Sequence, residues 1–133
     1  MKIVIDVNIW ISFGIGKELS TLPKLLVRKD LQIFSCSELT DELEIVCKYP
    51  KLKKYLSDKR IDEIFELIAR LTITETIKAS NANFSDPKDN YLLNLLETVA
   101  ANYLITGDKR LLTLGSYKQT KIISFKDFQN LLN

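Results

Sequence analysis

Asp6 is the first residue whose position suggests chemistry. It directly follows a short apolar run, Ile3-Val4-Ile5, and the amide Asn8 comes two residues later. Short runs rich in β-branched residues are typical of buried strands. A lone carboxylate at the end of such a strand is too costly to bury without a partner. Because open α/β sheets bind ligands in a crevice at the carboxyl ends of their strands, we expect Asp6 to face such a crevice.

Three more acids stand where predicted elements begin or end. Asp86 and Asp89 open a predicted helix, and Asp108 follows a predicted strand that ends in Thr106. Parallel strands end at the same edge of a sheet, so acids that are distant in sequence can converge there. These acids are therefore candidates to join Asp6.

A fifth acid is contributed by a helix predicted over residues 38–48. At about 100° per residue, Glu42 lies nearest to the apolar stripe of this helix and should point inward or into a cleft. Asp41 should point to solvent. The stripe consists of Leu39, Leu43, Val46 and Cys47.

Converging carboxylates need a cation. Two such charges about 4 Å apart repel by about 4 kcal/mol at an effective dielectric constant near 20. Hard oxygen ligands suit Mg²⁺ or Mn²⁺, and such an ion can activate water and stabilise the leaving oxygen of a phosphodiester. The chain contains no histidine, which excludes Ser-His-Asp catalysis, Cys-His catalysis and histidine metal ligands. The chemistry available to the sequence is therefore mainly that of carboxylates.

The same acids also have structural interpretations. Asp86 is a good N-cap followed by a proline, and Asp89 would then lie near the positive end of the helix dipole. Asp108 could cap the short helix that follows it. Glu42 alone would be an ordinary solvent-facing helix acid. Asp6 is the hardest of them to explain in this way.

Composition bounds the class of protein. The chain has 133 residues, of which 46% are hydrophobic and 27% are charged, and we expect one domain over residues 1–133. The net charge of +2 is too small to indicate nucleic-acid binding by itself. Cys36 and Cys47 lack metal-ligand spacing, so we expect buried thiols and a cytoplasmic protein. We expect no membrane span, because no apolar run approaches about 18 residues.

Strands and helices alternate along the chain, which predicts a mostly parallel sheet with helices on both faces. The expected strands are 2–6, 32–35, part of 72–78, 103–106 and 121–123. The expected helices are 9–15, one from Ser20 or Thr21 to 28, 38–48 capped by Ser37, 51–56, one from Ser57 to about 71, 86–101, 109–114, and one from Ser124 to 132.

Four segments together resemble the PIN domain. More closely, they are similar to its prokaryotic subfamily of VapC-like toxins from toxin–antitoxin pairs. The resemblance covers nearly the whole chain in the expected order. The segments are IVIDVNIWIS at 3–12, Glu42-Leu43, DPKDN at 86–90 and LITGDK at 104–109.

The resemblance implies a fold, an activity and partners. The fold is a Rossmann-like three-layer α/β/α domain with a mostly parallel central sheet. The activity is that of a Mg²⁺- or Mn²⁺-dependent endoribonuclease acting on single-stranded RNA. The relatives also imply an antitoxin partner and often a homodimer. The site acids that carry over are Asp6, Glu42, Asp89 and Asp108, with Asp86 as a ligand through water and with Asn8 and Thr106 as orienting polar residues.

Our hypothesis from these residues is that Asp6, Asp89 and Asp108 bind one ion directly. Glu42 would help to hold a second ion or a water, and cleavage would leave a 5′-phosphate and a 3′-hydroxyl. Arg110 departs from the family pattern, because similar proteins often have an acid at that position. It could alter phosphate contacts or the second metal position.

A basic stretch over residues 48–55 could hold RNA. Four lysines are interleaved there with two tyrosines, a pattern suited to phosphate contacts and base stacking. A solvent-facing helix with inward tyrosines explains the pattern equally well. The lysines are Lys48, Lys51, Lys53 and Lys54.

Two other functions stay open. An aspartyl phosphotransfer domain also places an acid like Asp6 at the end of an early strand. A phosphatase of that kind needs a second Asp where Asn8 stands, and a receiver domain needs an early acidic pair that is lacking here. A non-catalytic PIN-like module that binds RNA or protein is the other alternative, and the intact acids argue against it.

Overall fold

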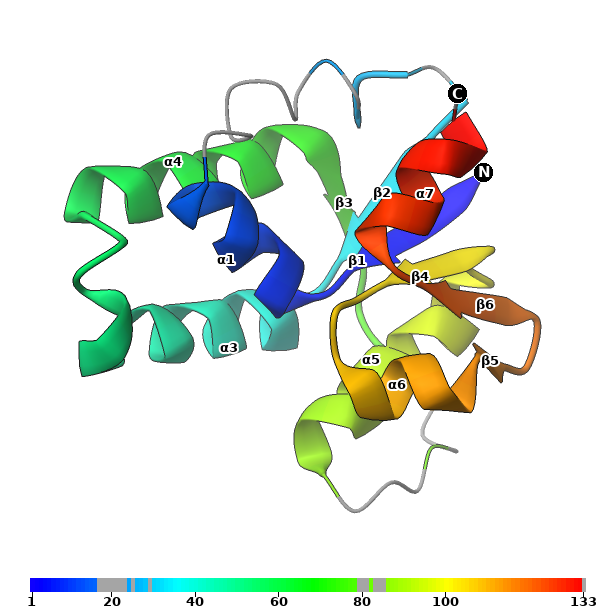
Figure 1. The fold of residues 1–133 in the computed structure, drawn as a ribbon. Coiled ribbons are helices and arrows are strands. Elements are labelled where there is room, and N and C mark those ends of the chain that lie inside the picture. Colours follow the sequence, from blue (N-terminus) through cyan, green and yellow to red (C-terminus); the bar gives the residue numbers. More distant parts are fainter. Residues whose placement is uncertain (17–23, 25, 29, 79–81, 83–85, 133) are drawn as a thin grey trace.

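The computed structural model describes residues 1–16, 24, 26–28, 30–78, 82 and 86–132. Its strands are β1 (Lys2–Ile5), β2 (Gln32–Ser35), β3 (Thr72–Thr74), β4 (Tyr103–Ile105), β5 (Ser116–Tyr117) and β6 (Thr120–Ile123). They form one six-stranded sheet in the order β3-β2-β1-β4-β6-β5 (Figure 1). All neighbouring pairs are parallel except β5 with β6.

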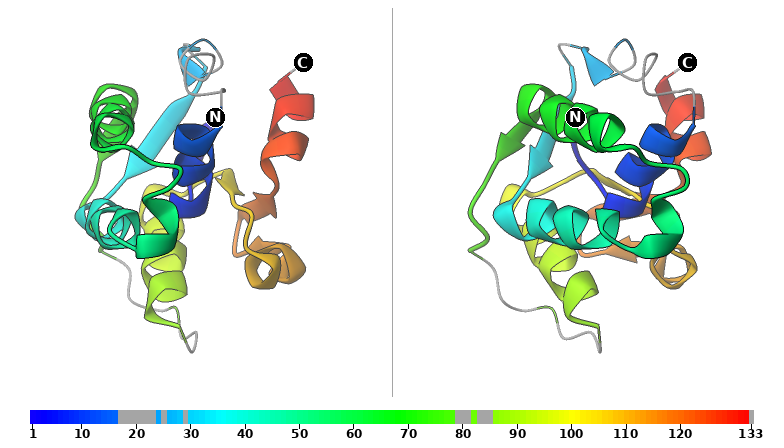
Figure 2. Two further views of the ribbon diagram at one scale, coloured as in Figure 1. Left: turned by 60° about the vertical axis from the view of Figure 1, so that its left-hand side comes forward. Right: turned by 90° about the vertical axis from the view of Figure 1, so that its left-hand side faces the viewer.

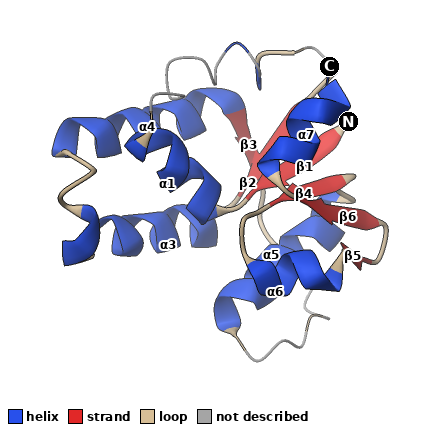
Figure 3. Cartoon of the chain, in the orientation of Figure 1, coloured by secondary structure: helices blue, strands red, loops and turns tan. Residues whose placement is uncertain are grey.

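Helices flank this sheet (Figure 3). The predicted α/β class with a mostly parallel central sheet is therefore confirmed. The predicted helix from Ser20 or Thr21 to 28 falls largely outside the described residues. The helices are α1 (Val7–Ile15), α3 (Ser37–Cys47), the 3₁₀ turn η2 (Pro50–Leu52), α4 (Asp58–Leu71), α5 (Pro87–Val99), α6 (Lys109–Leu114) and α7 (Phe125–Leu132).

The chain changes direction across the sheet after β3. From β1 it moves outward to β2 and β3, and α5 then carries it back past β1 to β4. α1, α3 and α4 lie together on one side of the sheet (Figure 2). Because parallel crossovers are right-handed, the returning helix α5 covers the opposite face. The carboxyl ends of β1 and β4 thus meet at a topological switch point, where open α/β sheets bind ligands.

The central strand β1 explains why this edge is rigid. Ile3, Val4 and Ile5 are at most 1% exposed, as expected for a strand covered on both faces. Ile5 pairs with Ile105 of β4, and the backbone N–H of Asp6 donates to the carbonyl oxygen of Ile105 at 2.9 Å. The residue after β1 is therefore fixed beside the residue after β4.

Helix α1 is anchored to the core by its aromatic residues. The indole Nε1 of Trp10 donates to the carbonyl oxygen of Ile5 at 3.2 Å, which ties the helix to the strand before it. The ring of Phe13 lies edge-on to Trp10 and, at 4.9 Å between centroids, to Phe125 of α7. These contacts fix the start of α1, which borders the candidate site.

Several sequence-based details were wrong. Cys36, not Ser37, is the N-cap of α3, and no side-chain hydrogen bond caps that helix. The expected helix over 51–56 is only the turn η2, whereas the strand expected within 72–78 is confirmed as β3. The two-residue strand β5 was missed because it is too short to show an alternating pattern.

Other details were confirmed. Ser57 accepts a hydrogen bond from the backbone N–H of Arg60, and Ser124 accepts one from that of Asp127. Cys36 and Cys47 are buried free thiols. Burial raises the pKa of Cys36 to about 11, so that thiol stays protonated at neutral pH. Within the described residues, no helix has both the length and the apolar character that a membrane span requires.

Gly14 allows α1 to approach α4 closely, and this gives the first prediction. A Cβ at this position would overlap Ile64 Cδ1 and lie 2.9 Å from Leu56 Cδ2, and both side chains are buried. Gly14→Ala should therefore lower the free energy of unfolding by about 1–3 kcal/mol through overpacking, although alanine favours a helix. Urea denaturation would measure the change.

The second variant for this test is Gly14→Ala combined with Ile64→Val. It removes the overlapping methyl group and should recover part of the lost stability. A Gly14→Ala protein more stable than wild type would contradict the proposed close packing.

Candidate functional site

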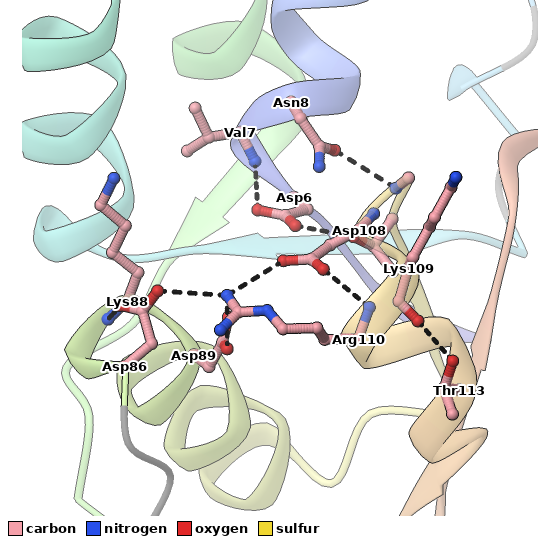
Figure 4. A network of polar contacts seen from close by, with 12 residues as sticks. Asp6, Val7, Asn8, Asp86, Lys88, Asp89, Asp108, Lys109, Arg110 and Thr113 are labelled. Atoms are coloured by element: carbon pink, nitrogen blue, oxygen red, sulfur yellow. Dashed lines mark hydrogen bonds and ion pairs between the residues drawn. The ribbon is translucent and has the colours of Figure 1, made fainter.

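All five predicted acids line one cleft at the switch point. Figure 4 shows Asp6, Asp86, Asp89 and Asp108 there. The cleft has a volume of about 300 Å³ and opens at the carboxyl ends of β1 and β4. The acids reach it from four places: the start of α1, the inner side of α3, the start of α5 and the start of α6. They are Asp6, Glu42, Asp86, Asp89 and Asp108.

Asp6 is held by two hydrogen bonds. Its Oδ1 accepts from the backbone N–H of Val7 at 2.7 Å, which makes Asp6 the N-cap of α1. Its Oδ2 accepts from the hydroxyl of Thr106 at 2.7 Å. Only 7% of the residue is exposed. The carboxylate is thus fixed in orientation by donors from both neighbouring strand ends.

The pKa of Asp6 is raised to about 6, mainly by burial and also by the nearby carboxylates of Glu42 and Asp108. The hydrogen bonds from Thr106 and Val7 oppose this rise because they stabilise the charged form. The raised pKa means that ionised Asp6 lacks a compensating positive charge close by. This is the electrostatic condition under which a cation would bind.

The two predicted orienting residues connect the loops of the site. Buried Thr106 donates to Asp6, and its hydroxyl oxygen accepts from the backbone N–H of Asp108 at 3.1 Å. The Asn8 side-chain oxygen accepts from the backbone N–H of Gly107 at 3.3 Å. Together they fasten the loop after β4 to the start of α1.

Glu42 has a partner that sequence reasoning missed. The hydroxyl of Tyr91, on α5, donates to Glu42 Oε2 at 2.6 Å. Burial raises the pKa of Tyr91 above its ordinary value, and the Glu42 carboxylate raises it further, so the phenol stays protonated and keeps donating. As predicted, Glu42 faces the cleft, and Asp41 is exposed.

Asp89 is the most deeply buried acid of the cleft. The residue is 3% exposed, and its Oδ2 accepts no hydrogen bond from any described residue. Burial raises its pKa, an effect that the neighbouring Arg110 opposes. A buried carboxylate oxygen without a donor is costly, so it is a natural position for a cation.

Asp86 and Asp108 act as caps and line the cleft at the same time. Asp86 is the N-cap of α5 and accepts from the backbone N–H of Lys88 at 3.0 Å. Asp108 is the N-cap of α6 and accepts from the backbone N–H of Arg110 at 2.9 Å. The Lys88 hydrogen bond, aided by Arg110, lowers the pKa of Asp86. The capping interpretation of both acids is confirmed, and it does not prevent them from facing a ligand.

Arg110 places a positive charge among the acids. One guanidinium nitrogen, Nη2, lies 3.2 Å from Asp86 Oδ2, 3.3 Å from Asp89 Oδ2 and 3.6 Å from Asp108 Oδ2. In Figure 4 the guanidinium points into the space between these three carboxylates. The residue that departs from the family pattern is therefore in the site itself.

The donor set fits a hard divalent cation. It consists of carboxylate oxygens, one of which is buried without a hydrogen bond. As the side chains lie, however, no three acids or cysteines in the described part of the chain are arranged to hold one ion. The chemistry of the acids is suitable, and their present spacing is that of an ion-paired cluster around Arg110.

Exposed basic residues and a tyrosine also line the cleft and form its rim. Lys51, Lys88 and the half-exposed ring of Tyr49 line it. Of the four lysines proposed to contact RNA, only Lys51 is among its lining residues. Lys48 and Lys53 border a separate cavity of about 820 Å³ between the end of α3 and the start of α4, and Lys54 is simply exposed.

Sequence reasoning missed Tyr91, Lys88 and the placement of Arg110. Tyr91 and Lys88 flank Asp89 within a turn of the same helix, so they could have been found by asking which polar residues share the start of α5. The reach of Arg110 to Asp86 spans 24 residues and carries no local signal.

The raised pKa of Asp6 leads to a prediction about stability in metal-free buffer. Because the pKa is higher in the folded protein than the ordinary value of 3.8, ionising Asp6 costs stability. The cost is absent below about pH 4 and complete above about pH 6–7. As the pH rises from about 4 to about 7, the unfolding free energy of Asp6→Asn should therefore increase by about 2–3 kcal/mol relative to that of wild type. This follows from about 1.4 kcal/mol per pKa unit.

Urea denaturation in EDTA across this pH range measures the difference. Asp41→Asn removes an exposed carboxylate from α3 and controls for the lost negative charge. A difference between Asp6→Asn and wild type that is the same at pH 4 and pH 7 would show that the folded protein does not raise this pKa.

Comparison with known proteins identifies a family. Residues 2–110 match the family described as PIN domain. No curated protein and no solved structure matches the chain. The matched range includes every acid of the cleft and Arg110, and it covers well over half of the sequence. The chain therefore belongs to the PIN domain family.

Proposed function

We propose that this protein is a Mg²⁺- or Mn²⁺-dependent endoribonuclease that cleaves single-stranded RNA. Membership of the PIN domain family indicates nuclease-type function in general. The observation that carries the finer proposal is the meeting of Asp6, Glu42, Asp89 and Asp108 in one cleft at the switch point of the sheet.

The proposed metal ligands are Asp6, Asp89 and Asp108, with Asp86 acting through water and Glu42 holding a second ion or a water. A divalent ion bound there supplies the Lewis acidity that activates water and neutralises charge on a phosphodiester. The protein contributes orientation. Thr106 fixes the Asp6 carboxylate, and Tyr91 fixes that of Glu42.

The rim supports a single-stranded nucleic acid as substrate. Lys51 and Lys88 lie where they could neutralise backbone phosphates, and Tyr49 offers a ring on which an unpaired base could stack. A duplex would hide its base faces from such a ring. This favours single strands, and the identity of the sugar is an outcome of the cleavage test below.

The biological context is a proposal that rests on the resemblance to VapC-like toxins. In this proposal the protein is the cytoplasmic toxin of a toxin–antitoxin pair, acts as a homodimer, and is blocked by an antitoxin segment that enters the acidic cleft. A neighbouring gene for a small DNA-binding protein would support it. Light scattering of the purified protein would test the dimer.

One observation favours the alternative of a non-catalytic RNA- or protein-binding module. Arg110 already pairs with three of the acids, as expected for a site that no longer holds metal. Such a module would bind RNA without cleaving it at any metal concentration. Measuring RNA binding and cleavage on the same preparation separates the two functions.

The proposed function predicts EDTA-sensitive cleavage of single-stranded RNA in Mn²⁺. Asp6→Asn and Glu42→Gln should each reduce the rate at least about 100-fold, because they remove a proposed ligand rather than only an outer support. Asp41→Asn, one residue from Glu42 but exposed, is the matched control and should cleave like wild type. Single-stranded DNA of the same sequence tests the choice of sugar.

Wild-type protein that cuts RNA no faster than Asp6→Asn in Mn²⁺ would contradict the proposed function. Acetyl phosphate labelling of Asp6 in that case would identify an aspartyl phosphotransfer domain instead.

The position of Lys51 leads to a separate prediction. Lys51→Gln should raise KM about three- to tenfold with little change in kcat. It should also reduce the slope of log affinity against log salt by about 0.7, the value for one phosphate contact on a single strand. Lys53→Gln removes the same charge from a residue that lines the other cavity. Equal effects of the two variants would contradict a specific role for Lys51.

A further inference from the structure

Arg110 carries an inference that goes beyond the proposed acids. We propose that its guanidinium is a tethered cation that occupies a metal position between Asp86, Asp89 and Asp108. Metal binding and these three contacts would then be mutually exclusive. This inference rests on the proposed metal dependence and deepens it, since it makes Arg110 the residue that sets how much metal the site requires.

The geometry is that of one cation shared by three carboxylates. A single atom, Nη2, lies within 3.6 Å of an oxygen from each of the three acids. These acids come from the starts of two different helices, α5 and α6. The positive charge therefore sits where the three carboxylates converge, rather than in an ordinary pair along one helix.

Asp89 supplies an independent reason why a cation must stay there. Its side chain is only 5% exposed, and Oδ2 accepts no hydrogen bond from a described residue. The nearest positive charge is Arg110 Nη2 at 3.3 Å. Because α5 holds Asp89 in place, the acid cannot turn to water, and its ionised form needs either this guanidinium or another cation.

Two cations cannot use these oxygens at once. Mg²⁺ lies about 2.1 Å from its oxygen ligands, so an ion bound by Asp86, Asp89 or Asp108 would need the space that Nη2 occupies. It would also repel the guanidinium charge. The same competition accounts for the finding that no three acids of the described chain are arranged to hold an ion.

Arg110 is free to be displaced. Its side chain is 58% exposed, so it can swing into solvent without disturbing the core. The hydrogen bond that caps α6 comes from its backbone N–H, not from its guanidinium. Replacing the side chain should therefore remove the competing charge and leave the helix cap intact.

The test is calorimetric titration of the metal-free protein with Mn²⁺. Arg110→Gln should lower the Kd for Mn²⁺ at least tenfold. A guanidinium and a divalent ion about 6 Å apart repel each other strongly enough to weaken binding about tenfold, even at the dielectric constant of water. Arg110→Lys keeps the charge and should stay within about threefold of wild type.

Lys109→Gln is the matched control. It removes the same charge from the adjacent residue, whose exposed side chain points away from the acids in Figure 4. It should change the Kd less than threefold.

Thermal unfolding gives a second readout that needs no activity. In EDTA, Arg110→Gln should have a lower Tm than Lys109→Gln, because its three acids lose their counter-ion. The gap should close at saturating Mn²⁺. Arg110→Met, which keeps an aliphatic stem, is a second neutral variant should the glutamine fold poorly.

The outcomes separate this inference from the proposed function. Equal or weaker Mn²⁺ binding by both neutral variants would overturn the competition and leave metal-dependent cleavage standing. If wild type and all variants bind no Mn²⁺, the proposed function itself fails. Mn²⁺ binding by Arg110→Gln but not by wild type would be the clearest support for the inference.

Discussion

Five carboxylates at one edge of the sheet repel one another, and the hydrogen bonds and charges around the cleft counter this repulsion. The acids are held by several kinds of donor. Asp6 has a hydroxyl and a helix N-terminus, Glu42 has a phenol, and Asp86 and Asp108 have backbone N–H groups. Asp89 has the guanidinium of Arg110 near its buried oxygen, which accepts no hydrogen bond from a described residue. The fold thus orients the acids without fully neutralising their charges. Ionising Asp6 therefore costs stability, as its raised pKa indicates.

Three of the acids that line the cleft are also the N-caps of helices. Asp6, Asp86 and Asp108 each cap a helix that begins at the cleft, and such a cap stabilises a helix start by about 1 kcal/mol. The positive ends of the helix dipoles in turn stabilise the three negative charges. Capping and ligand binding are therefore not competing explanations for these acids. The cap uses one oxygen of each acid, and the second oxygen meets Thr106 in Asp6 and Arg110 in Asp86 and Asp108.

The sequence was sufficient to predict the parallel sheet and the five acids of the cleft, because both follow from local signals and topology. A buried strand that ends in an acid, and a helix that begins with one, can be recognised from a few residues. The donors could not be predicted in this way. Tyr91 reaches Glu42 across 49 residues, and Arg110 reaches Asp86 across 24. Strand β5 was missed because two residues are too few to show an alternating pattern. The start of α3 at Cys36 was missed because no side-chain hydrogen bond marks it.

The charges that line the cleft indicate how many ions it suits. Five acids face three basic residues, Lys51, Lys88 and Arg110, so the lining is short of two positive charges. One divalent ion would balance that difference. A second ion would leave the cleft positive unless negative charge arrived with it, and a phosphodiester backbone carries such charge. A site of this kind would fill its second cation position only together with substrate, and a guanidinium displaced from the acids would then lie close to the incoming phosphate.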